Sequence, residues 1–175
     1  HPDIIDFINA KQNEEKKAWA LIEQGYSGGM NGEAYGSISF QNCNMSVRVP
    51  DEFIDVVKNN GEWQTKFVKD GKVCETFKAK EILKKIAEGT WICGDPGMQF
   101  DTINNNWHTC KNTDRIYATN PCSEYSFLDD SACNLASINL IKFRTDDGNF
   151  DSEKFKKVVD RFIIAMELFV DGASY

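Results

Sequence analysis

The sequence has few of the features that mark nucleic-acid-binding or membrane proteins. No block of lysine and arginine is longer than a pair, and the 175 residues carry a net charge of −7. This balance argues against a surface for nucleic acid or anionic lipid. No apolar run approaches the roughly 18 residues that a membrane-spanning helix needs, and the N-terminus lacks the basic and apolar regions of a secretion signal. We therefore expect a cytoplasmic protein with no nucleic-acid or membrane partner.

Common cofactor and metal motifs are also missing. The glycine-rich stretch 25–37 does not follow the dinucleotide fingerprint, and no Lys-Ser or Lys-Thr closes a phosphate-binding loop. We expect it to be a flexible connection. The chain has two histidines and no paired Cys-x-x-Cys. Its six cysteines are expected to be reduced, because a chain of this length and apolar content does not need disulfides to fold.

Apolar residues are plentiful: 41% of the chain is hydrophobic and 12% is aromatic, which is typical of a folded domain with a core. The tryptophans are expected in that core; they are Trp19, Trp63, Trp91 and Trp107. The chain starts without methionine and ends soon after a long amphipathic segment. We interpret residues 1–175 as a single, incomplete piece of a larger domain, with no linker that would divide it.

Hydrophobic periodicity predicts helices alternating with strands. Helices are expected over 2–24, after Pro50, from Thr76 to Gly89, and after the turn 146–149. Strands are expected over 44–49, within 90–100 up to a turn at Asp95-Pro96-Gly97, and over 132–140, with a hairpin over 62–75 that turns at Asp70-Gly71. This order favours an α/β fold with largely parallel strands.

A motif of three chemically active side chains lies between these elements. Asn120, Cys122 and Glu124 are spaced by two, and Pro121 favours an extended backbone at Asn120. In an extended segment the three side chains point to the same side. An amide, a thiol and a carboxylate are poor core material, since each needs a polar partner when buried. The motif therefore predicts a site that faces a small polar molecule.

The other cysteine of this region, Cys133, has apolar neighbours. It opens the expected strand 132–140, on the same face as Leu135, Ser137 and Asn139. A thiol on such a strand is ordinarily a packing residue. The residues alone therefore give Cys133 no chemical role.

The run "NPCSEYSFLDDSACNLASINL" (120–140) closely resembles the active-site loop and following strand of the ribonucleotide reductase large subunit. The residue sequence of this run is similar to that of the adenosylcobalamin-dependent class II enzymes. The segments "HPDIIDFINAK", "FQNCNMSVRV" and "GDPGMQFDTINNNWHTC" also resemble class II segments, in the expected order. The resemblance covers essentially the whole chain.

The resemblance implies a fold, an activity and a set of roles. The family fold is a ten-stranded α/β barrel with a central active-site finger loop, of which this chain would be a part. Cys122 would carry the thiyl radical that abstracts the ribose 3′-hydrogen, Glu124 would be the base on the 3′-hydroxyl, and Asn120 would hold the ribose hydroxyls. Cys133 would be one half of a redox pair whose other half lies upstream of His1. The fragment alone would then be inactive.

The implied cofactor is adenosylcobalamin, and the implied partners are a ribonucleotide substrate, nucleotide effectors and an external thiol reductant such as thioredoxin. Whether the substrate is a diphosphate or a triphosphate, and whether the parent protein is a homodimer, stays open.

Other interpretations stay open as well. Within the same family, the radical would come from a separate di-metal subunit if the parent is a class I enzyme. A zinc site would use Cys93, His108 and Cys110. A thiol hydrolase would pair Cys122 with His108 as its base. A truncated copy that acts only as a folded module is the non-enzymatic alternative.

Overall fold

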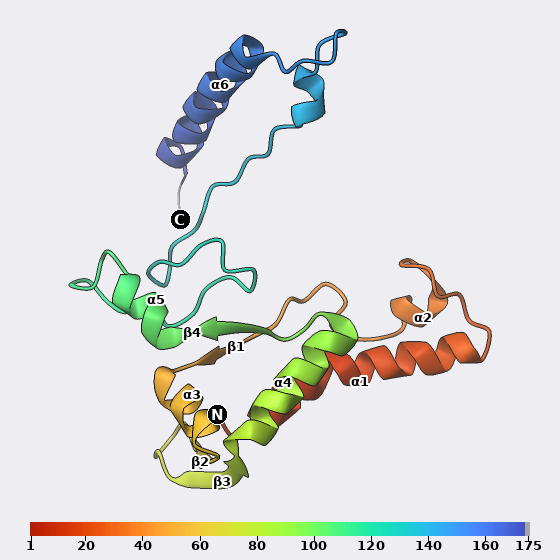
Figure 1. Ribbon diagram of the computed structural model, residues 1–175, viewed down its shortest axis with the longest axis vertical. Coiled ribbons are helices and arrows are strands. Elements are labelled where there is room, and N and C mark those ends of the chain that lie inside the picture. Colours follow the sequence, from red (N-terminus) through yellow and green to blue (C-terminus); the bar gives the residue numbers. More distant parts are fainter. Residues whose placement is uncertain (174–175) are drawn as a thin grey trace. The chain divides into compact units, whose positions relative to one another are not determined.

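A computed structural model of the chain describes residues 1–173, and its contacts divide the chain into two compact units at Asp129 and Asp130. The sequence showed no linker at this point. The division falls in the stretch 114–139, which contains neither helix nor strand (Figure 1). This stretch has no ladder or helical hydrogen bonds of its own.

The first unit begins with α1 (Ile4–Glu23), as the sequence predicts, and the short helix α2 (Glu33–Gly36). The glycine-rich segment is not only a loop, because α2 interrupts it. Two hydrogen bonds tie this region to α1: Tyr35 Oη donates to Glu15 at 2.7 Å, and the Ser39 backbone N–H donates to Glu14 at 2.9 Å. Hydrogen bonds at the C-terminal end of the glycine-rich region therefore hold it against α1.

The predicted strand followed by a helix is confirmed as β1 (Ser46–Val49) and α3 (Asp51–Lys58). β1 pairs in parallel with β4 (Gly97–Phe100), and α5 (Asp101–Trp107) follows directly. The buried face of β1 packs on α1, α3 and α4 (Ala79–Cys93), of which α1 and α4 lie side by side (Figure 1). The core residues are Ile8, Val47, Val49, Phe53, Val57, Ala79, Ile82 and Ile86.

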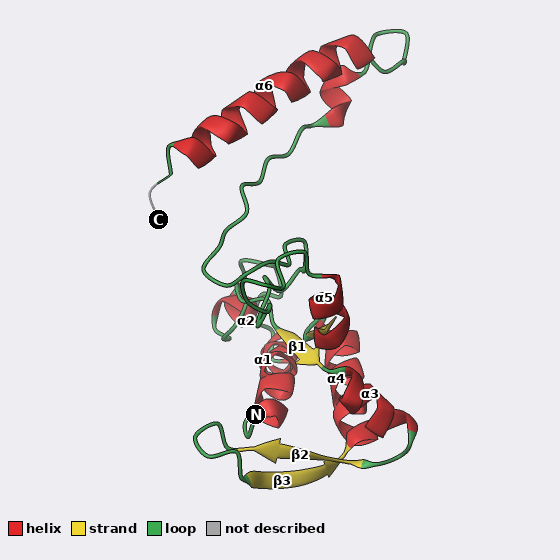
Figure 2. Cartoon of the chain, turned by 90° about the vertical axis from the view of Figure 1, so that its left-hand side faces the viewer, coloured by secondary structure: helices red, strands yellow, loops and turns green. Residues whose placement is uncertain are grey.

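The predicted hairpin is confirmed as β2 (Glu62–Lys66) and β3 (Val73–Lys78), an antiparallel pair (Figure 2). The predicted limits of the next helix, and of the strand expected before the turn at Asp95-Pro96-Gly97, were wrong. Thr76 pairs with Gln64 inside β3, so it does not cap α4, and α4 continues through Gly89 to Cys93. A Cβ at Gly89 would lie 3.0 Å from the Asp95 carbonyl oxygen. Gly89 therefore serves close packing, and Gly94, with a φ of 80°, ends the helix.

The second unit contains the 3₁₀-helix η1 (Leu140–Phe143) and the predicted long helix α6 (Ser152–Asp171). Phe143 is buried, with its ring 5.3 Å from that of Phe155. The strand predicted over 132–140 is wrong for this structure, because no strand occurs among residues 130–139. A strand requires a ladder partner, and this unit supplies none to that segment.

The described residues form two separate two-stranded sheets and no closed barrel. The mixed α/β content that the sequence predicts is confirmed, but only one of the two strand pairs is parallel. The expectation for the tryptophans was wrong in part. Trp91 and Trp107 are 89% and 84% exposed, whereas Trp63 packs edge-on against Phe53. Apolar residues on α6 are exposed too, and none of its residues is buried.

Candidate active site

The motif of residues 120–124 forms a tight turn. The Ser123 backbone N–H donates to the Asn120 carbonyl at 3.0 Å, and Ser123 has a φ of 62°. The predicted extended backbone is therefore wrong at this point. Proline fits the second position of a β-turn because its φ is fixed near the value that this position requires. Cys122 follows Pro121 in the turn, and its side chain is exposed.

The turn brings together the amide and the carboxylate of the motif. Asn120 Nδ2 donates a short hydrogen bond to Glu124, while Asn120 Oδ1 accepts the Tyr125 backbone N–H at 3.2 Å. The hydrogen bond from Asn120 lowers the pKa of the Glu124 carboxyl below its ordinary value. The carboxylate is thus ionised at neutral pH, which is the form that a general base requires.

Three polar side chains, two from the sheet and one from the segment before β1, contact three consecutive residues of the turn. Gln99 Nε2 donates to the Asn120 carbonyl at 3.2 Å. Ser46 Oγ donates to the Pro121 carbonyl at 3.0 Å, and Asn44 Nδ2 lies 3.6 Å from the Cys122 sulfur. The sequence analysis missed these residues. The available signal was the alternation of Ser46 and Arg48 with the buried Val47 and Val49, which leaves polar side chains on one face of β1.

An ion-pair network fixes the chain that leads into the turn. Asp101 accepts hydrogen bonds of 2.6 Å from both Arg48 and Arg115. Arg48 also donates to the Ile116 carbonyl at 3.2 Å, and Asn105 bonds both the N–H and the carbonyl of Ile116. Burial alone would raise the pKa of Asp101, but the two guanidinium groups outweigh it and hold that pKa below its ordinary value.

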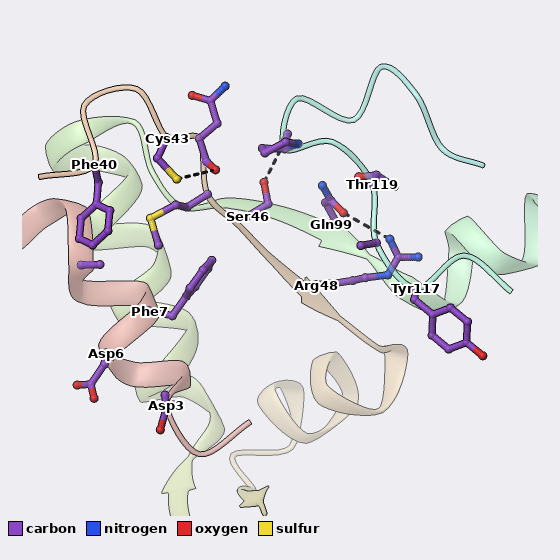
Figure 3. Close-up of a pocket in the computed structure, with 15 residues that line it drawn as sticks. Asp3, Asp6, Phe7, Phe40, Cys43, Ser46, Arg48, Gln99, Tyr117 and Thr119 are labelled. Carbon is purple, nitrogen blue, oxygen red and sulfur yellow. Dashed lines mark hydrogen bonds between the residues drawn. The ribbon is translucent and has the colours of Figure 1, made fainter. Parts of the chain in front are cut away.

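A cavity of about 810 Å³ lies beside the turn. Pro121 forms part of its wall, opposite apolar side chains of α1 and of the segment before β1. Figure 3 shows Ser46 and Gln99 on the side of this cavity where the chain of residues 117–121 passes. The motif is therefore at the edge of a space large enough for a small molecule.

Cys133 belongs to the second unit and is exposed. Its neighbour Asn134 donates a hydrogen bond of 2.9 Å to the Met166 carbonyl of α6. The packing role that the residues alone suggested for Cys133 is not seen within this unit, because the strand that would have buried the thiol is absent.

His108, which both rival sites would use, is engaged by other groups. His108 is buried, its Nε2 lies 3.2 Å from the Asp114 carbonyl oxygen, and its ring packs edge-on against Phe127. Between residues 1 and 173, no group of three histidine, cysteine or acidic side chains is arranged to hold a metal ion. No helix in the same range is long and apolar enough to cross a membrane.

Comparison with known proteins identifies relatives along the whole chain. The family model described as "Ribonucleotide reductase, barrel domain" matches residues 1–175. A vitamin B12-dependent ribonucleotide reductase of Rhodopirellula baltica is 55% identical over 177 residues, which cover 100% of this chain and 17% of the relative.

Two further relatives agree. The Streptomyces coelicolor protein of the same name is 45% identical, covering 100% of this chain and 18% of its own length. A vitamin B12-dependent ribonucleoside-diphosphate reductase of Thermoplasma acidophilum is 31% identical, covering 91% of this chain and 18% of the relative. The chain thus spans less than a fifth of these relatives, and it belongs to the ribonucleotide reductase barrel-domain family.

Proposed function

We propose that the protein containing this chain reduces ribonucleotides to 2′-deoxyribonucleotides by a thiyl-radical mechanism of the adenosylcobalamin-dependent class. The observation that carries the proposal is the contact between Asn120 and Glu124 on a turn that exposes the Cys122 thiol. A thiol that can become a thiyl radical, a general base and an amide within one turn match what the 3′-position of a ribose requires. The names of the relatives favour this class over one whose radical comes from a separate subunit.

The roles of Cys122 and Glu124 are supported by their geometry, whereas those of Asn120 and Cys133 rest on the family resemblance. The exposed Cys122 sulfur, as a thiyl radical, takes the 3′-hydrogen from the ribose and becomes a thiol again. Glu124, ionised because Asn120 donates to it, accepts the proton of the 3′-hydroxyl. Asn120 orients the ribose hydroxyls. Loss of the 2′-hydroxyl as water then requires two electrons and protons, which Cys133 and a second cysteine supply by forming a disulfide.

The residues present fit adenosylcobalamin in one respect. The chemistry that this cofactor supplies is a carbon-centred radical, from homolysis of its cobalt–carbon bond. The thiol that gives up its hydrogen must be reachable, and Cys122 is exposed at the tip of a turn. Cys122 is the residue of this chain that would face the cofactor.

The proposal extends to the assembly around the site. We infer that residues 1–175 are one piece of a ten-stranded barrel, in which the chain around Cys122 forms the central finger loop. The exposed apolar side chains of α6, among them Phe162, Leu168 and Phe169, would then pack on the rest of the barrel. The substrate is a ribonucleotide, the effectors are nucleotides, and an external dithiol protein of the thioredoxin type restores the cysteine pair in the cytoplasm.

The test uses the full-length protein with Cys122→Ser. Ribonucleotide reduction in the presence of adenosylcobalamin and a dithiol is expected to fall below detection, since a serine hydroxyl does not form the radical. Cys74→Ser is the matched control, because Cys74 lies on β3 in the hairpin, and it should keep the activity of the unmodified protein. Continued reduction by the Cys122→Ser protein would overturn the proposal.

A further inference from the structure

Polar side chains of β1 and of the segment before it lie along the chain that leads into the active-site turn and forms it. Arg48 donates to the Ile116 carbonyl, Ser46 to the Pro121 carbonyl, and Asn44 to the Cys122 sulfur. Arg48 and Ser46 contact backbone atoms and so fix where the chain runs. Asn44 contacts the atom that the proposed function makes reactive.

We propose that Asn44 is a positioning residue for Cys122, holding its sulfur through an amide N–H···S hydrogen bond; this inference rests on the proposed function. An amide N–H donates only, so the sulfur must accept, and the hydrogen of the Cys122 thiol is left free. A thiol that gives up and regains a hydrogen atom needs that S–H bond directed away from the protein. The contact of 3.6 Å between Asn44 Nδ2 and the Cys122 sulfur holds the sulfur. It does not use the S–H hydrogen, which can therefore point away from the protein.

The surroundings of Asn44 support a dedicated role. Met45, the next residue, is buried, and Ser46 is hydrogen-bonded to the turn, so the backbone on one side of Asn44 is fixed. The Met45 carbonyl also accepts the Gly97 backbone N–H at 2.8 Å, which ties this segment to β4. The Asn44 amide is therefore carried by an anchored segment, which is what a positioning group requires.

The first test measures the thiol itself and needs no cofactor. In the full-length protein, Asn44→Leu removes the donor while keeping a side chain of similar size. Alkylation of Cys122 by iodoacetamide, at one fixed pH and quantified by fragment-ion mass spectrometry, is expected to slow about three- to tenfold. The thiolate is the reacting species and loses a hydrogen bond that stabilises it.

The direction of the change separates positioning from a structural role. If Asn44 only stiffened the loop, its removal would expose the sulfur and speed up alkylation, so a faster or unchanged rate overturns the inference. Asn44→Asp, which is nearly isosteric, should also slow alkylation, because a carboxylate repels the thiolate. The Asn44→Asp variant keeps the test decisive if the Asn44→Leu protein does not fold. Asn42→Leu is the matched control and should leave the rate unchanged, since Asn42 is exposed two residues earlier.

A second measurement links the contact to turnover. The Asn44→Leu enzyme is expected to lose about tenfold in kcat with little change in KM, since the proposed contact of Asn44 is with Cys122. A change in KM alone would count against the inference. The outcomes stay distinguishable: slower alkylation in a protein that reduces no ribonucleotide would refute the proposed function and leave the role of Asn44 standing.

Discussion

Gly97 lies opposite Ser46 in the parallel pairing of β1 and β4, and a Cβ at Gly97 would come within 2.9 Å of the Ser46 hydroxyl oxygen. That hydroxyl donates to the Pro121 carbonyl in the turn that carries Cys122. The absence of a side chain on one strand therefore leaves room for a hydroxyl on the next strand, and that hydroxyl supports the turn that carries Cys122.

Gly97→Ala should displace the Ser46 hydroxyl and break its bond to the turn. We expect a loss of about 1 kcal/mol in the free energy of unfolding, the usual contribution of one hydrogen bond, together with reduced turnover. Urea unfolding and activity assays of the full-length protein measure the two effects. Gly36→Ala is the control, because a Cβ there meets no atom within 4 Å. Equal behaviour of the two variants would contradict the packing argument.

Asp101 should contribute stability that depends on pH. Its pKa is lower in the folded protein than in the unfolded chain. At pH values between these two pKa values, the unfolded chain therefore binds more protons than the folded protein. The contribution is complete above the unfolded pKa of about 3.9 and is lost as the pH falls through the folded pKa. Asp101→Asn should remove this part of the acid dependence of unfolding.

Denaturant unfolding at a series of acidic pH values measures the Asp101 effect. The control is Asp6→Asn, at an exposed carboxylate that forms no ion pair with any other residue in the range 1–173. It should keep the acid dependence of the unmodified protein. The same dependence in Asp101→Asn would show that the two arginines do not stabilise the fold through Asp101.

The bond from Asn120 should set the acid limit of the reaction. Asn120→Leu removes the main cause of the lowered pKa of Glu124, so that pKa should rise toward its ordinary value. Because the base must be ionised, the acid limb of the kcat/KM profile should move to higher pH. Profiles are compared only where circular dichroism shows both proteins folded. Glu124→Gln, which has no carboxylate, should lack this limb altogether; an unmoved limb in Asn120→Leu would argue that another group controls it.

Cys133→Ser should separate hydrogen abstraction from reduction. Under the proposed mechanism, the variant still abstracts the 3′-hydrogen through Cys122 but cannot complete the disulfide that supplies electrons. We expect loss of label from a 3′-tritiated ribonucleotide with no sustained formation of deoxyribonucleotide. Cys110→Ser, which changes a half-buried thiol of the first unit, is the control and should turn over normally. Unchanged multiple turnover in Cys133→Ser would remove this cysteine from the redox pair.

Much of the local structure was predictable from the sequence. The helices α1, α3 and α6 and the hairpin of β2 and β3 follow from the spacing of their apolar residues and from their turn residues. The limits of α4 were not predictable, because Thr76 and Gly89 carry ordinary cap and stop signals whose use depends on neighbours far along the chain. Thr76 joins a ladder with Gln64, and Gly89 fits against Asp95.

The sequence by itself singled out Asn120, Cys122 and Glu124 as candidate chemical groups, through their residue types and their family resemblance. Only the tertiary structure decided how they meet. A turn, not an extended strand, joins Asn120 to Glu124, and side chains over 70 positions earlier, Asn44 and Ser46, hold that turn. Periodicity reports the face on which a side chain lies, but hydrogen bonds between distant segments arise only when the fold brings those faces together.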